Sequence, residues 1–135
     1  MYKRQGSEGT DLEKHVFKIA KKGDLRILGP NSIGLINISD NVILSANAML
    51  ELQDLKKGSL AVISHSGSLI GALLAHGHSR GIGFSKLISV GNESDLSVGE
   101  IGKMLVNDPN TETIILFLET LRTVSYTHLR AQRPS

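Results

Sequence analysis

The stretch that most constrains the fold of this chain is residues 60–75, LAVISHSGSLIGALLA. A short apolar run at residues 60–63 stops at a small polar loop, residues 64–68, and an apolar pattern with helical spacing follows at once. The stretch predicts a β-strand, a tight turn and the N-terminus of an α-helix. The first turn of a helix offers N–H groups without intrahelical acceptors, which with the helix dipole favour anions such as phosphate. The same motif is typical of any ordinary strand-to-helix connection, so its context has to decide.

The same alternation of strand and helix continues downstream. We expect a strand at residues 84–90, a polar loop at 91–95, a helix at 98–106 and an apolar, central strand at 113–118. This order predicts an α/β fold, a three-layer parallel sheet with right-handed crossovers and helices on both faces. Ligands of such sheets bind at the carboxyl ends of the strands. We therefore expect the loops at 64–68 and 91–95 and Glu119 to converge on one edge.

The chain before residue 60 is less regular. Leu12, Val16 and Ile19 share one face of a predicted surface helix, which we expect to pack on a sheet. Residues 25–28 predict a short buried strand that ends at the turn Gly29-Pro30-Asn31.

The segment that follows this turn gives weaker patterns. Residues 34–37 indicate a further brief extended piece, and Asp40-Asn41 indicates a turn. Residues 38–58 show no sustained period, so we expect an irregular connection there.

Composition excludes several classes of protein. The chain has no cysteine, which excludes a disulfide framework and cysteine metal sites, and we expect no metal site of its own. No apolar run approaches membrane-spanning length and the start lacks the core of a signal peptide, so we expect a cytoplasmic protein.

Both ends of the chain have no periodicity and resemble translated adapter sequence, so we expect residues 1–5 and 123–135 to be foreign. Without their four basic residues Lys+Arg falls from 15 to 11 against 13 acids, and the net charge changes from +2 to −2. The basic character then disappears, and with few aromatic residues nothing supports a nucleic-acid partner.

Four segments together resemble the NDP-forming acyl-CoA synthetases, a family that includes the succinyl-CoA ligase α subunit and the ADP-forming acetyl-CoA synthetases. The segments are RILGPNSIG at 26–34, VISHSGSLIGA at 62–72, GFSKLISVGNESDL at 83–96 and NDPNTETIILFLET at 107–120. The resemblance implies that residues 6–40 are the C-terminal part of a Rossmann-like CoA-binding domain. Residues 41–122 would then be an incomplete succinyl-CoA ligase-like domain of the flavodoxin type.

The resemblance also implies a reaction, in which acyl-CoA, phosphate and NDP are interconverted with acid, CoA and NTP through an acyl phosphate and a phosphohistidine. By matching position, Ser66, Gly67 and Ser68 would hold the phosphoryl group, with His65 as a polar neighbour rather than the phosphoryl acceptor. Glu119 would orient the phosphohistidine, which is absent from this chain. The turn of Gly29, Pro30, Asn31 and Ser32 would lie near CoA, and a purely structural turn is an equal alternative.

The same resemblance implies coenzyme A, phosphate, and ADP/ATP with Mg²⁺ as cofactors, the nucleotide and metal belonging to a nucleotide-grasp (ATP-grasp) module or β subunit. The substrate would be an acyl-CoA or a carboxylic acid, and we expect an oligomer in the intact protein. We expect the chain alone to be inactive and its incomplete sheet to expose apolar edges. Two other functions stay open: an acyl-CoA-sensing module of a protein lysine acetyltransferase, and a non-catalytic binding domain.

Overall fold

A computed structural model describes residues 7–46 and 55–119 of the chain. The two ends that we expect to be foreign, residues 1–5 and 123–135, lie outside the described residues. The elements, in chain order, are α1 (Ser7–Lys22), β1 (Gly34–Asn37), β2 (Val42–Ser45), β3 (Lys57–Ser64), α2 (Gly67–Ser79), β4 (Phe84–Ser89), α3 (Val98–Val106) and β5 (Thr113–Phe117).

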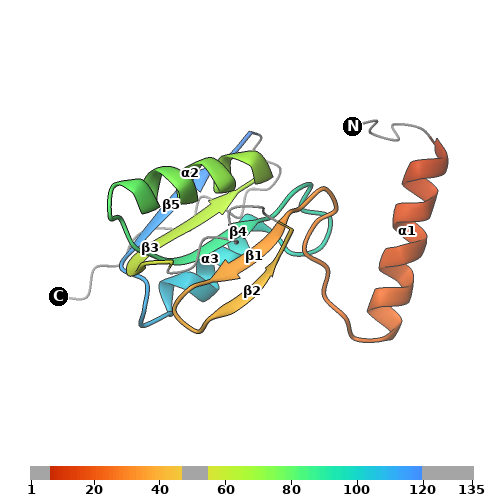
Figure 1. Cartoon of the computed structure of the whole chain (residues 1–135). Helices are drawn as coiled ribbons and strands as arrows, with labels where there is room; N and C mark the ends of the chain where they lie inside the picture. Colours follow the sequence, from red (N-terminus) through yellow and green to blue (C-terminus); the bar gives the residue numbers. More distant parts are fainter. Residues whose placement is uncertain (1–6, 47–54, 120–135) are drawn as a thin grey trace.

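The strands form one sheet in the order β2-β1-β4-β3-β5, with a helix layer on each face (Figure 1). β3 is parallel to β4 and to β5, so the predicted strand-helix-strand-helix-strand order and its parallel sheet are confirmed. The bounds of α3 agree with the prediction, and β4 and β5 each end one residue earlier than expected.

The central strands separate two cores by their alternating side chains. Val62 and Leu87 belong to the core beneath α2, whereas the neighbouring residues Ile63 and Ile88 belong to the core beneath α3. Alternation places successive side chains on opposite faces, and burial on both faces explains why residues 60–63 of β3 and 87–88 of β4 are apolar in succession.

The sheet is mixed rather than wholly parallel, because a hairpin completes it. β1 pairs antiparallel with β4 and with β2, so the expected extended piece at residues 34–37 is confirmed. The expectation of an irregular connection at residues 38–58 is wrong for residues 42–45, which form β2, and for residues 57–58, which begin β3. β2 lies at the edge of the sheet. Its three apolar residues follow one another and are all exposed, so the sequence lacks the alternation of apolar and polar residues that predicts a half-buried strand.

The predicted strand at residues 25–28 is wrong, because the segment forms no strand and Leu25 is 66% exposed. Its backbone is bonded to a loop instead: Ile27 N–H donates to Asp95 Oδ2 at 2.6 Å, and Leu96 N–H donates to the Ile27 carbonyl at 3.2 Å. A segment of four residues, three of them apolar, cannot reveal whether its hydrogen-bond partners belong to a strand or to a loop.

The expected packing of α1 on a sheet is also wrong within the described residues. Leu12, Val16 and Ile19 are 46–56% exposed, and α1 stands to one side of the sheet (Figure 1). A polar contact, from the Ser94 hydroxyl to Glu13, joins α1 to the loop after β4. No helix among residues 7–46 and 55–119 is long and apolar enough to cross a membrane.

The predicted central position of the strand at residues 113–118 is wrong for the described sheet, because β5 lies at its edge. Its residues Ile115, Leu116 and Phe117 are each 40–43% exposed, which confirms the expected exposure of apolar edges. An apolar strand at an unpaired edge offers both side chains and backbone groups to a further strand.

Candidate functional site

Two loops and one further residue meet at the carboxyl ends of the parallel strands, and we call this edge the rim. The first loop is residues 64–68, after β3, the second loop is residues 91–95, after β4, and Glu119 follows β5. The Val90 N–H donates to the Ser64 carbonyl at 2.9 Å, and the His65 N–H donates to the Phe117 carbonyl at 3.1 Å. The predicted convergence on one edge is therefore confirmed.

His65 connects all three parts of the rim. Its Nε2 lies 2.5 Å from Glu93 Oε1, and its Nδ1 accepts the backbone N–H of Glu119 at 3.0 Å. The side chains of His65 and Glu93 are only 6% and 3% exposed. Because a backbone N–H can only donate, Nδ1 carries the lone pair and Nε2 carries the proton in a neutral ring. Both ring nitrogens are thus engaged, which agrees with a supporting role for His65 rather than a nucleophilic one.

The first turn of α2 faces the same edge. Ser66 is the N-cap residue, but its side chain forms no capping hydrogen bond and instead lies 3.1 Å from the Ser68 hydroxyl. Ser66 is partly exposed and Ser68 is exposed. The N–H groups of this turn have no intrahelical acceptors, so together with the two hydroxyls they can donate to an anion.

The Gly29-Pro30-Asn31 turn lies against the second loop. The Asn92 N–H donates to the Pro30 carbonyl at 2.8 Å, and the Ser94 N–H donates to the Gly29 carbonyl at 3.1 Å. A Cβ on Gly91 would stand 2.2 Å from the Pro30 carbonyl oxygen, so only glycine permits this approach.

The residues after this turn reach the strands and the first loop. The Ser32 hydroxyl donates to the Ser89 carbonyl at the end of β4 and accepts the Gly34 N–H. A Cβ on Gly67 would stand 2.5 Å from Ile33 Cγ2, so the start of α2 touches this segment. The structure therefore brings the four residues from Gly29 to Ser32 to the same rim as residues 64–68.

The approach to the turn is fixed by charge. The Arg26 guanidinium contacts Asp95 and Glu100 at 3.0 Å each. Hydrogen bonds from Arg26, and then from the Ile27 N–H, hold the pKa of the Asp95 carboxyl below its usual value. Hydrogen bonds from Arg26, and then from the Ser97 backbone, likewise lower the pKa of Glu100. Ionised carboxylates therefore hold this segment: Asp95 of the second loop binds Arg26 and the Ile27 N–H, and Glu100 of α3 binds Arg26.

Two residues of this site were not singled out from the sequence. Glu93 accepts from both His65 and the Val98 N–H, the latter at 2.7 Å, and Asp95 binds Arg26 and Ile27. The sequence identified their polar loop but not their partners, because those partners lie up to 69 positions away along the chain. The positive φ of 50° at Glu93 leaves no mark in the sequence either, since glutamate is not a residue typical of that conformation.

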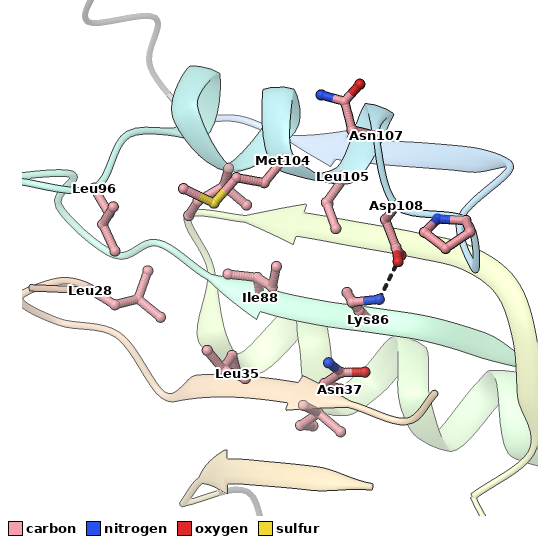
Figure 2. A pocket seen from close by; sticks show the side chains of 13 residues that line it. Leu28, Leu35, Asn37, Lys86, Ile88, Leu96, Met104, Leu105, Asn107 and Asp108 are labelled. Carbon is pink, nitrogen blue, oxygen red and sulfur yellow. Dashed lines mark hydrogen bonds and ion pairs between the residues drawn. The ribbon is translucent and has the colours of Figure 1, made fainter. Parts of the chain in front are cut away.

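A groove of about 520 Å³ lies away from the first loop, between α3 and strands β1 and β4. Figure 2 shows Leu28, Leu35, Ile88, Leu96, Met104 and Leu105 along it. At its other end Lys86 Nζ and Asp108 Oδ2 lie 2.5 Å apart, so these charges already satisfy each other. The rim has the convergent polar donors that a charged substrate requires, and we place the candidate site there. No group of three or more potential metal ligands occurs within residues 7–46 and 55–119.

Residues 57–132 match the family model described as the succinyl-CoA ligase like flavodoxin domain. The chain is 32% identical over 120 residues to a 4-hydroxybutyrate–CoA ligase [ADP-forming] of Nitrosopumilus maritimus, covering 89% of this chain and 17% of that protein. It is 37% identical over 117 residues to the acetate–CoA ligase [ADP-forming] II subunit alpha of Pyrococcus furiosus, covering 87% of this chain and 24% of that subunit.

The fold is similar to a solved structure of the dinucleotide forming acetyl-coenzyme A synthetase 1 of Ca. Korarchaeum cryptofilum in complex with phosphate and ADP. The TM-score is 0.75 at 31% identity, over 84% of this chain and 24% of that one. The chain thus spans a quarter or less of the length of these relatives.

Proposed function

The chain belongs to the family of the succinyl-CoA ligase like flavodoxin domain, and on this basis we propose that it is part of an ADP-forming acyl-CoA ligase. The intact protein would interconvert acyl-CoA, phosphate and ADP with a carboxylic acid, CoA and ATP. In this proposal the chain contributes the site that holds the phosphoryl group, and the phosphohistidine and the nucleotide module with its Mg²⁺ lie elsewhere in the protein or its partner subunit.

The observation that carries the proposal is the uncapped first turn of α2 at the rim. Ser66 and Ser68 pair with each other instead of capping the helix, so an arriving phosphate meets hydroxyl and N–H donors together. Such fixed donors stabilise the negative charge of a transferring phosphoryl group. The related acetyl-coenzyme A synthetase of Ca. Korarchaeum cryptofilum forms a complex with phosphate and ADP, which is consistent with this class of ligand.

Glu119 is proposed to orient the phosphohistidine. It is exposed at the end of β5, on the same edge as the first loop. A carboxylate there can accept a hydrogen bond from an imidazole and fix its tautomer.

Residues 6–40 are proposed to derive from a CoA-binding domain, with the segment from Gly29 to Ser32 near CoA. The exposed apolar face of α1 supports this, because such a face is stabilised by a further layer of structure. β1 precedes the proposed boundary at residue 40 yet pairs with β4, so it would connect the two domains.

The test is a calorimetric titration of the purified chain with inorganic phosphate. We expect measurable binding, which Ser66→Ala weakens by about tenfold, since a hydrogen bond to a charged group is worth roughly 1.5 kcal/mol or more. Ser79→Ala is the matched control, because Ser79 lies at the opposite end of α2 and bonds the His76 carbonyl. An unmodified chain that releases no heat on titration, or equal losses in both variants, would overturn the phosphate site.

A further inference from the structure

We propose that His65 is a positioning residue that fixes Glu119 relative to the first loop and the second loop. This proposal rests on the proposed function in one respect, namely that Glu119 is the carboxylate that has to be positioned. The contacts themselves are independent of any ligand.

The pairing of β3 with β5 explains why Glu119 needs such support. The regular register ends at the pair Ser64 and Phe117. Beyond it, the His65 N–H bonds the Phe117 carbonyl at 3.1 Å, and the His65 ring accepts the Glu119 N–H at 3.0 Å. A side chain thus takes the place of the next backbone acceptor and holds the chain two residues past the last paired position of β5.

The ring can do this only if it is itself held in one orientation. Glu93 provides this, because its Oε1 lies 2.5 Å from His65 Nε2 while its Oε2 accepts the Val98 N–H at the start of α3. The backbone of Glu93 adopts a φ of 50°, which costs energy for a non-glycine residue. The connection therefore runs from α3 through Glu93 and His65 to the backbone of Glu119.

The geometry determines the tautomer. With Nδ1 accepting from Glu119, the neutral ring must carry its proton on Nε2 and donate it to Glu93. Ring ¹⁵N spectra of the full 135-residue chain at neutral pH should show the Nε2–H tautomer for His65. A ring protonated at Nδ1 would overturn the proposal, and this measurement requires no variant to fold.

Two substitutions separate the two ring nitrogens. An asparagine amide reaches approximately as far as Nδ1, so His65→Asn can keep the bond to the Glu119 N–H and lose the one to Glu93. A glutamine amide reaches approximately as far as Nε2, so His65→Gln keeps Glu93 and loses Glu119. We expect hydrogen exchange of the Glu119 amide to accelerate about five- to tenfold more in His65→Gln than in His65→Asn, as expected for one lost hydrogen bond.

The control readout is the Val98 amide, which bonds Glu93 rather than His65. Its exchange should be faster in His65→Asn than in His65→Gln, the reverse of the order at Glu119. Equal effects of the two variants at Glu119 would show that His65 acts only by filling space and would refute the positioning role. The phosphate titration is a separate measurement: its failure with these exchange results intact refutes the phosphate site alone.

Discussion

Replacing Gly91 with alanine tests the close packing of the rim most directly. Gly91 has a φ of 58°, and an added Cβ would lie 2.2 Å from the Pro30 carbonyl oxygen and 2.7 Å from the Asn31 carbonyl carbon. These are backbone atoms, so the Gly29-Pro30-Asn31 turn has to move away. The movement would break the hydrogen bond from the Asn92 N–H to the Pro30 carbonyl.

The expected loss has three contributions. The left-handed backbone costs a residue with a Cβ roughly 1–2 kcal/mol, overpacking costs roughly 1–3 kcal/mol, and the lost hydrogen bond costs about 1 kcal/mol. We therefore expect Gly91→Ala to lower the free energy of unfolding by about 3–6 kcal/mol.

Gly81→Ala is the matched control. Gly81 has a similar φ of 69°, but its added Cβ would meet only the Lys56 Nζ, at an ordinary 3.7 Å. This variant bears the backbone cost alone, and the entropy that alanine removes from the unfolded chain is the same in both variants. The difference between the two variants, about 2–4 kcal/mol, isolates the steric contact and the hydrogen bond that it breaks.

The assay is urea unfolding followed by circular dichroism at one chain concentration. With a slope of about 2 kcal/mol/M, the midpoints of the two variants should differ by about 1–2 M. Equal midpoints would refute the packing of the second loop against the Gly29-Pro30-Asn31 turn.

Two further predictions concern charge and the sheet edge. Hydrogen bonds from Lys86, and then from the Thr111 hydroxyl, lower the pKa of the Asp108 carboxyl in the folded chain. The stability that ionised Asp108 contributes is therefore present above its unfolded pKa of about 3.9 and is lost as pH falls through the lower folded pKa. Asp108→Asn should lower the urea midpoint at pH 7, and the difference from the unmodified chain should shrink below about pH 4; a constant difference would contradict the ion pair. Ile115→Lys should reduce self-association measured by light scattering, because it places a charge on the exposed edge strand β5. Val106→Lys, at an exposed position on α3, is the control and should have a smaller effect. The reverse order would exclude the edge of the sheet as the associating surface.

The local pattern of the sequence was enough to predict the core of the fold and the edge that carries the candidate site. The segments of β3, β4 and β5 were sufficient because their short length, their β-branched and aromatic residues and the turn residues that flank them favour strands over helices. The parallel order then placed residues 64–68, 91–95 and Glu119 on one edge, since the carboxyl ends of parallel strands must coincide.

Which groups become partners depends on the tertiary structure. The short segments at residues 25–28 and in β2 do not encode their neighbours. The first is bonded to a loop, and the second lies at a sheet edge. The helical spacing of apolar residues in the sequence predicts the apolar face of α1, but whether that face is buried or exposed depends on what lies beside it. Likewise the sequence shows His65 and Glu93 only as two polar loop residues. Their 2.5 Å contact arises from long-range packing, which brings together residues 28 positions apart.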